Sequence, residues 1–462
     1  MTTMPTMPTA PGPVPPGDSQ PVHAGRIGRV VAGSLAIGLI TAVLLILAPF
    51  ISPDENHVTG ALLCGFAVGW AILAILSTRY TDQPQRWAAG AALFMGLGGL
   101  VLIGFGSASR PVLNWVWPPA MFALVIWMFV QVRRHLHGRS GRWLLYMVFA
   151  ALAVASVAGG YETVREQVDA NAFPMPGQLI DVGGHGLHLH CRGTGSPTVV
   201  LQPGGGDFSS VMGWIAPAVA ARTRVCVYDR AGRGWSETAD RAQDATQIAD
   251  ELHTLLQRAN VPGPYVLAGH SFGGLYSLAH SEQYPGDVAG MVLIDSTNPG
   301  IVADPAKATA YDSSSSDAAT DRVAALAAAA ARLGLVRLIG TISYGDLPPQ
   351  ARDEVRAKTA TADYASGWVN EFVQANASGA EAAMLTDFGD KPVVVLTAGG
   401  ETNATHDAAQ NKLATLSTNS THRVIPHASH IGLITDQQYA EVTTQCILDV
   451  VTAIRDNQPV VK

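Results

Sequence analysis

The sequence predicts two parts of different class: an all-α region of transmembrane helices and, after it, an α/β region with a mostly parallel sheet. Residues 27–160 contain five long apolar stretches with almost no charge inside them. From residue 177 onward, short apolar strands alternate with helical segments, which is the pattern of βαβ units. The charge is divided in the same way, since residues 1–160 carry a net +5 and residues 161–462 a net −12.

The composition of the 462-residue chain excludes several classes of protein. It is 48% hydrophobic and only 14% charged, with a mean hydropathy of +0.20, whereas soluble globular proteins have about 25% charged residues. A disordered chain, a coiled coil and a nucleic-acid binder are therefore not expected. Four cysteines are too few for a small disulfide scaffold or for two CxxC zinc pairs.

The first 160 residues read as a disordered N-terminus and a membrane domain. Residues 1–25 are rich in Pro, Thr and Gly and have little apolar surface to bury. The apolar stretches that follow are Ile27–Phe50, Val58–Ser77, Trp87–Gly106, Pro111–Val130 and Trp143–Gly160. About 20 helical residues cross the ~30 Å hydrocarbon core of a bilayer. We therefore predict five transmembrane helices within residues 26–160 and a linker over residues 161–176.

The arginines set the expected orientation. Eight of the nine in this region fall at the N-terminal end or in the second and fourth loops, whereas Arg110 stands alone in the third. The positive-inside rule then places the N-terminus in the cytoplasm and everything after the fifth span outside it. The spans contain no acidic residue, which disfavours transport and favours anchoring among membrane lipids.

The sharpest motif in the second part is "GHSFGG", residues 269–274. It matches G-x-S-x-G, in which a serine nucleophile stands on a tight turn between a strand and a helix. The strand "PYVLAG" precedes it and the helical segment "LYSLAHSEQY" follows it. Ser271 is therefore the candidate nucleophile.

Residues 177–455 resemble the α/β-hydrolase fold family. The matching pieces are "LHLHCRGTGSPTVVLQPGGG", "RVCVYDRAGRGWSE", "GPYVLAGHSFGGLYSLAHSEQYP", "GMVLIDST" and "VVVLTAG", with "PHASHIGLITDQ" near the C-terminus. The resemblance implies an α/β-hydrolase domain over residues 177–462, with flanking helices and a helical lid at about 297–390. Trp368, Phe372 and Met384 are candidate liners of a substrate pocket beneath that lid.

The resemblance also implies the roles of the site residues. His430 is favoured over His427 as the general base that takes the proton of Ser271. The oxyanion of an acyl-transfer intermediate needs two N–H donors, which we assign to Gly205 and Phe272.

The acid that orients the histidine is left open. Asp295 ranks first because some members of the family place the acid at the end of that strand. Glu401 ranks second and Asp407 third, since they follow the later strand where the family usually has it. Cys191 and Cys226 fall on strands that are neighbours in the family's sheet, and they form either a disulfide or two buried thiols.

Together these observations predict a membrane-anchored, extracytoplasmic serine hydrolase that acts on small-molecule or lipid carboxylic esters. No cofactor is implied, and His185, His188 and His190 lack the spacing of a metal site. Two alternatives stay open at this point: an acyltransferase to a lipid or cell-wall acceptor, and a non-catalytic hydrolase-like binding module on a membrane protein.

Overall fold

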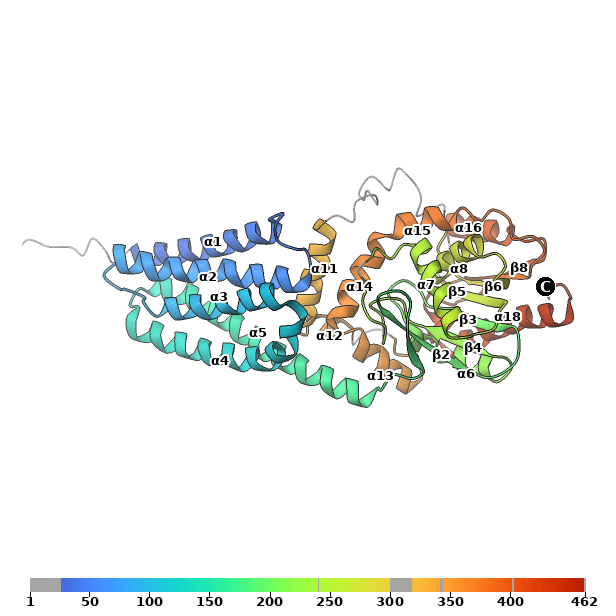
Figure 1. Cartoon of the computed structure of the whole chain (residues 1–462), viewed down its shortest axis with the longest axis horizontal. Coiled ribbons are helices and arrows are strands. Elements are labelled where there is room, and N and C mark those ends of the chain that lie inside the picture. The colour runs from blue at the N-terminus through green and yellow to red at the C-terminus, as the bar shows by residue number, and fades with distance from the viewer. Residues whose placement is uncertain (1–25, 240, 300–317, 341–343, 401–402, 461–462) are drawn as a thin grey trace, which may run out of the picture.

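The computed structural model describes residues 26–239, 241–299, 318–340, 344–400 and 403–460. An elongated helical bundle forms one end of the molecule and an α/β domain the other, and several lid helices lie between them (Figure 1). The N-terminal 25 residues and Glu401, about which the sequence made predictions, lie outside the described residues.

Five helices form the bundle, and each runs opposite to the one before it (Figure 1). They are α1 (Arg26–Leu47), α2 (Glu55–Tyr80), α3 (Ala88–Phe105), α4 (Arg110–His135) and α5 (Arg139–Ala172). The 3-10 turn η1 (Gly106–Ser109) reverses the chain between α3 and α4. The rings of Phe94 in α3 and Trp117 in α4 stack 4.5 Å apart across that reversal.

Four helical runs in this region are long and apolar enough to cross a membrane: Ile27–Leu47, Glu55–Tyr80, Ala88–His135 and Arg139–Ala172. The third run comprises α3, η1 and α4, and Gly106 has a φ of +51° at the point where it turns back. Each of the five predicted apolar stretches therefore lies in a helix of its own. The runs number four because α3 and α4 are joined by η1 without a break.

The last helix of the bundle is longer than the sequence predicted. Residues 161–172, expected as linker, continue α5 without a break. Arg165 and Asp169 form an i,i+4 ion pair on this extension, and Arg337 of the lid binds both Glu162 and Asp169. These polar contacts favour helix in a segment that was predicted to be a linker.

An eight-stranded sheet forms the centre of the α/β domain, in the order β1-β2-β4-β3-β5-β6-β7-β8. Its first three strands pair antiparallel and the others are parallel. The strands are β1 (Gln178–Asp181), β2 (Gly186–Arg192), β3 (Thr198–Gln202), β4 (Val225–Tyr228), β5 (Tyr265–His270), β6 (Val288–Ile294), β7 (Val393–Ala398) and β8 (Ser420–Ile425). This arrangement confirms the predicted fold class.

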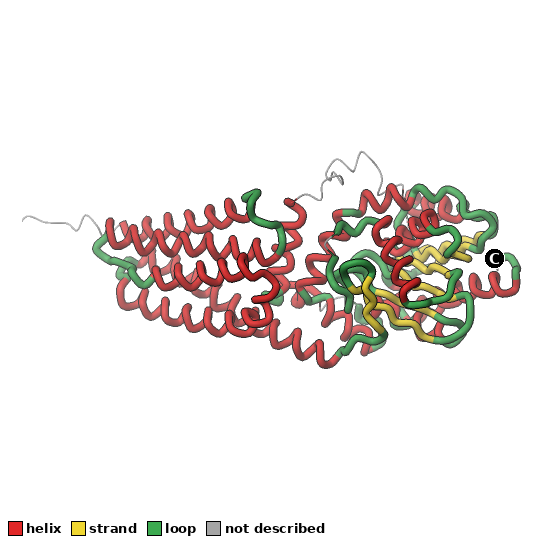
Figure 2. The backbone as a smooth tube through the Cα atoms, in the orientation of Figure 1, coloured by secondary structure: helices red, strands yellow, loops and turns green. Residues whose placement is uncertain are grey.

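Helices cover both faces of the sheet, so its central strands are buried on both sides. One core includes residues of α6 (Ile215–Ala220), α17 (Gly432–Thr435), α18 (Gln437–Asp456) and the 3-10 turn η2 (Ser209–Met212). The other includes residues of α7 (Ala245–Arg258), α8 (Phe272–Gln283) and α16 (Ala404–Ala414). Figure 2 shows these two helical layers around the strands.

The lid is inserted between β6 and β7. Its described helices are α11 (Ala318–Ala331), α12 (Leu335–Gly340), α13 (Pro349–Lys358), α14 (Ala362–Val373) and α15 (Ala375–Ala382). Helix α11 packs against α2 of the bundle on one side and against α14 on the other. The lid therefore connects the bundle to the part of the domain that carries Ser271.

Cys191 in β2 and Cys226 in β4 are directly opposite each other in the register of this antiparallel pair. They form a disulfide. The remaining two cysteines, Cys64 and Cys446, form no disulfide.

Candidate active site

Ser271 occupies the tight turn between β5 and α8. Its φ of +54° is rare for a residue with a side chain, and such strain is common at functional sites. Glycines make the turn possible: a Cβ on Gly269 would lie 2.3 Å from the carbonyl oxygen of Gly273, and one on Gly273 would lie 2.1 Å from that of Gln202. The motif spacing therefore has a steric cause.

Asp295 and His430 meet beside this turn. The Nδ1–H of His430 donates to Oδ2 of Asp295 over 2.6 Å. Asp295 follows β6 directly, and His430 follows β8 in the loop before α17. Because Nδ1 carries the proton in this hydrogen bond, Nε2 of His430 is left with the lone pair that a general base requires.

Three donors converge on the Asp295 carboxylate, which is 4% exposed. Besides His430, the Nε2–H of His406 donates to Oδ1 over 2.8 Å, and the backbone N–H of Ala398 donates to Oδ1 over 3.1 Å. Burial would raise the pKa of Asp295, but these hydrogen bonds outweigh it and hold the pKa below its ordinary value. The carboxyl group therefore stays ionised beside His430.

Three further candidates of the sequence analysis lie away from the contact between Asp295 and His430. Asp407 is in the first turn of α16 and makes no hydrogen bond to His430. His427 is exposed and has a φ of +63°. Met384 is 65% exposed, after the end of α15. His406, one residue before Asp407, is the group in that segment that contacts Asp295, and it was not among the predicted site residues.

His270, directly before Ser271, is a second residue that the sequence analysis missed. Its Nε2–H donates to the carbonyl oxygen of His430 over 3.0 Å, and the two imidazole rings lie 4.5 Å apart. The pKa of His270 is lowered to about 3, mainly by burial and to a smaller extent by the neighbouring His430. His270 is therefore neutral near pH 7 and fixes the backbone that carries His430.

The loop after β3, Pro203–Gly206, lies against the serine turn. A Cβ on Gly204 would be 3.2 Å from Cβ of Ser271, and one on Gly205 would be 3.0 Å from the ring of Phe272. The guanidinium of Arg230 donates to the carbonyl oxygens of Pro203 and Gly204, over 2.9 and 2.6 Å.

These two bonds orient the loop. The C=O and N–H of one trans peptide point in opposite directions, so the N–H groups of Gly204 and Gly205 point away from Arg230. Neither has an acceptor among the described residues. Phe272 is the first residue of α8, where backbone N–H groups lack intrahelical partners. The loop and the helix therefore offer N–H donors on either side of Ser271.

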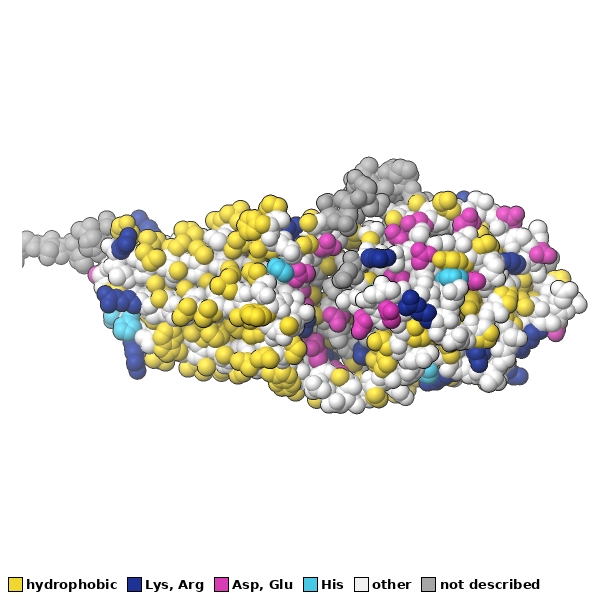
Figure 3. Space-filling model, viewed as in Figure 1, with side chains coloured by type: hydrophobic (Ala, Val, Ile, Leu, Met, Phe, Trp, Pro, Cys, Tyr) yellow, Lys and Arg dark blue, Asp and Glu magenta, His cyan; other side chains and the backbone are white. Residues whose placement is uncertain are grey.

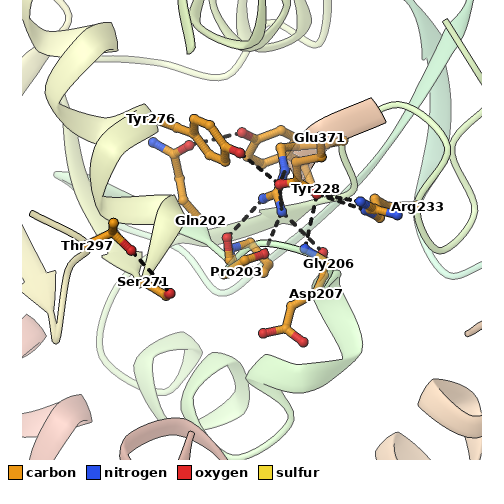
Figure 4. A network of polar contacts seen from close by, with 12 residues as sticks. Gln202, Pro203, Gly206, Asp207, Tyr228, Arg233, Ser271, Tyr276, Thr297 and Glu371 are labelled. Carbon is orange, nitrogen blue, oxygen red and sulfur yellow. Dashed lines mark hydrogen bonds and ion pairs between the residues drawn. The ribbon is translucent and has the colours of Figure 1, made fainter. Parts of the chain in front are cut away.

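A lid residue, Glu371 of α14, anchors the same loop from above (Figure 4). Its Oε2 accepts the backbone N–H of Gly206 over 3.0 Å, and its Oε1 accepts the hydroxyl of Tyr276 over 2.8 Å. It is also paired with Arg230 over 2.8 Å and with Arg233. Burial would raise the pKa of Glu371, but the two arginines lower it to about 2.

Aromatic side chains of the same helix cover the loop. The rings of Trp368 and Phe372 lie 4.4 Å apart, and Phe372 lies 5.3 Å from the ring of Phe272. A Cβ on Gly206 would be 2.9 Å from the Trp368 ring. Both lid side chains remain more than a third exposed, so they can contact a ligand as well as the loop.

The hairpin histidines have protein partners. Nδ1 of His188 contacts Oδ2 of Asp229 at 2.8 Å, and its Nε2 bonds the carbonyl oxygen of Pro176. His185 lies 3.4 Å from Glu251. Over the described ranges, no group of three or more His, Cys, Asp or Glu side chains could hold a metal ion.

A parallel sheet that presents a serine at a strand–turn–helix junction, with a histidine and an acid from later strand ends, is the architecture of α/β hydrolases. The chain belongs to the α/β hydrolase fold family, whose model matches residues 197–437, more than half of its length. Most members of this family are hydrolytic enzymes.

Individual relatives match only parts of the chain. An uncharacterised protein of Schizosaccharomyces pombe is 32% identical over 27% of this chain and 29% of its own length. The probable transporter efuK of Hormonema carpetanum is 30% identical over 25% of this chain and 18% of its own. Among solved structures, a thermophilic esterase from Thermogutta terrifontis is 21% identical, covers 60% of this chain and 99% of its own, and has a TM-score of 0.45.

Proposed function

We propose that the chain is a membrane-anchored serine hydrolase that cleaves carboxylic esters through an acyl-enzyme on Ser271. The observation that carries this proposal is the 2.6 Å hydrogen bond between Asp295 and His430, beside a serine on a strained turn. That combination is what a Ser–His–acid mechanism requires.

In this mechanism Oγ of Ser271 attacks the ester carbonyl while Nε2 of His430 takes its proton. Asp295 holds Nδ1–H and stabilises the imidazolium that forms. The N–H groups of Phe272 and of Gly205 stabilise the negative oxygen of the tetrahedral intermediate. His430 then protonates the leaving alcohol, and a water molecule activated by the same histidine releases the acid and restores Ser271.

Membrane anchorage is part of the proposal, supported by the four apolar helical runs. In the bundle, which contains arginine but no lysine, basic side chains gather at the end away from the α/β domain (Figure 3). By the positive-inside rule that end is cytoplasmic, so the site faces the extracytoplasmic side. A disulfide between Cys191 and Cys226 fits an oxidising compartment.

A fluorophosphonate probe on isolated membranes tests the mechanism, because it labels only an activated serine. Wild type and His427→Ala should be labelled, whereas Ser271→Ala and His430→Ala should not. His427→Ala is the matched control, since this exposed histidine is three residues from His430. Absence of label on correctly folded wild type would remove the hydrolase proposal.

The substrate class needs a second assay. The p-nitrophenyl esters of short and long acyl chains should be hydrolysed by wild type, and Asp295→Asn should lower kcat on the order of 10³- to 10⁴-fold. Activity on amides with none on esters would contradict the proposed substrate class.

A further inference from the structure

An apolar cavity lies inside the helical bundle, at the end that faces the α/β domain. Its volume is about 330 Å³, within the usual range for small-molecule sites. Side chains of α2, α3, α4 and α5 form its walls, and Ala329 and Leu333 of the lid form its roof. None of the site residues described above lines it.

The cavity has the depth of one bilayer leaflet. Its lining residues in α4 extend from Arg110 to Met121, which is about 16 Å at a rise of 1.5 Å per residue. The hydrocarbon core of a bilayer is about 30 Å thick, so a single acyl chain from one leaflet spans about half of it. The length and the apolar lining therefore match one lipid chain.

Hydrogen bonds from side chains to the backbone join two walls of the cavity, α4 and α5. Pro118 lacks an N–H, so the carbonyl of Asn114 has no intrahelical donor. The hydroxyl of Thr163 donates to that carbonyl over 3.2 Å, and the hydroxyl of Ser156 donates to the carbonyl of Pro118 over 2.6 Å. These bonds fix α4 against α5 at residues that line the cavity, so the cavity is built into the bundle.

A polar pocket of about 180 Å³ adjoins the apolar cavity and shares Glu166 and Arg332 with it. It lies between the end of α5 and the lid, where Asp and Glu side chains gather at the junction in Figure 3. Asp169, Lys358 and Asp363 also line it. An apolar cavity that continues into a charged pocket has the shape of a site for an amphiphile.

Two carboxylates in the pocket are available to a ligand. Arg332 is paired with Glu55 in α2 over 2.5 Å, and Asp169 is paired with lid and α5 arginines. Within the described part of the chain, the side-chain carboxylates of Glu166 and Asp363 make no hydrogen bond or ion pair, and both line the pocket. Burial raises the pKa of Asp363 and lowers that of Lys358, as expected for charged groups that are largely removed from water.

We infer that the two cavities form a binding site for a phospholipid with an amine-bearing headgroup. One acyl chain occupies the apolar cavity, the ammonium faces Glu166 and Asp363, and the phosphate faces Lys358. This inference rests on the membrane placement in the proposed function but not on the chemistry at Ser271.

The site connects the membrane to the lid. Its lining comes from α11, α13 and α14 as well as from α5. Helix α14 also carries Glu371 and Trp368, which contact the loop beside Ser271. A bound lipid therefore holds together the bundle and the helix that covers the serine.

Photolabelling tests the site in the full chain carrying Ser271→Ala, so that binding is measured without turnover. The protein is placed in phosphatidylcholine nanodiscs with a small amount of phosphatidylethanolamine that bears a diazirine on one acyl chain. Mass spectrometry should find adducts on the cavity walls as well as on exposed bundle residues. Ala155→Trp should remove the cavity adducts, because Ala155 lines the cavity.

Val154→Trp is the matched control, since Val154 is the preceding residue of α5 and is 69% exposed. It should leave the cavity adducts unchanged. If Ala155→Trp does not yield a monodisperse protein, Leu113→Trp fills the same cavity from α4, with Val112→Trp, 64% exposed in wild type, as its control.

The headgroup is tested with equivalent diazirine probes of phosphatidylglycerol and of a free fatty acid. Cavity labelling should be strongest with phosphatidylethanolamine, and Glu166→Gln with Asp363→Asn should remove that preference. Adducts confined to exposed residues, cavity labelling unchanged by both tryptophan substitutions, or equal labelling by the three probes would overturn the inference. Absence of fluorophosphonate labelling in wild type would instead contradict the hydrolase chemistry and would not affect the evidence for lipid binding.

Discussion

The buried histidine before Ser271 makes the fold sensitive to acid. An unfolded histidine titrates near pH 6.5, whereas the pKa of His270 is lowered to about 3 by its burial. Between these values the unfolded state binds a proton that the folded state does not. Stability from this group is complete above pH 6.5 and falls as the pH drops below it, by about 1.4 kcal/mol per pH unit.

His270→Gln should weaken this acid dependence. The side-chain amide of glutamine can still donate to the carbonyl of His430, but it does not titrate. Thermal unfolding of both proteins between pH 7 and 4 measures the effect. The melting temperature of the variant should fall less steeply than that of wild type, and parallel curves would show that His270 does not carry the sensitivity.

Single residues were predictable where a motif fixes the local backbone. The spacing of "GHSFGG" placed Ser271 at its turn because glycine is sterically required on both sides. The choice between Asp295 and the later carboxylates depends on which strand ends lie together, and no local pattern contains that information. His406 and Glu371 were missed for the same reason, since each acts through partners more than 100 residues away.

At the scale of elements, the pairing between α14 and the loop after β3 determines how the lid sits. Glu371 is 4% exposed and neutralises two buried guanidinium groups, Arg230 and Arg233. Glu371→Gln leaves both without a full counter-charge, and breaking a buried pair in this way costs about 3–5 kcal/mol. We therefore expect a large fall in melting temperature.

The same variant should lower kcat more than it raises KM, because Gly206 and the carbonyls held by Arg230 lose their anchor. The pKa of Glu371 is lowered to about 2 from an ordinary value of 4.5. The ionised carboxylate of Glu371 therefore stabilises the fold above pH 4.5, and this stabilisation is lost as the pH falls toward 2. The stability of the glutamine variant should not show this part of the pH dependence. Glu381→Gln is the control: this lid glutamate binds the backbone N–H of Thr246. Equal effects of both substitutions would contradict the argument.

Elements were predictable where they are buried on both faces. The central strands are continuous apolar runs, as parallel strands between two helical layers must be. Strand β8 escaped detection because it lies at the edge of the sheet and its sequence, "STHRVI", is half-buried and mixed in polarity. The extension of α5 was missed because part of its stability comes from one lid arginine, Arg337, which is far from residues 161–172 in the sequence.

For the whole molecule, the alternating direction of the five helices determines which of their ends, and so which basic residues, lie together (Figure 1). The start of α1, the end of α2, the end of α4 and the start of α5 lie together, away from the α/β domain (Figure 1). The basic residues expected to stay in the cytoplasm therefore cluster at one end. At the other end, Arg322 of α11 donates to the carbonyl oxygens of Ile46 and Ala48, so the lid rests on the α1–α2 loop.

This arrangement predicts opposite accessibility of two loops in intact cells. Asp181 in β1 is in the α/β domain, and Asp82 is in the loop after α2 at the basic end; both are exposed. With Cys64 and Cys446 replaced by Ala in both proteins, a membrane-impermeant maleimide should label Asp181→Cys in intact cells or spheroplasts. Asp82→Cys should be labelled only after lysis, because the positive-inside rule places that loop in the cytoplasm.

The Cys191–Cys226 disulfide does not react without a reductant, so each protein has a single target thiol. The reverse pattern would place Ser271 in the cytoplasm, where a stable disulfide is not expected, and would overturn the proposed orientation.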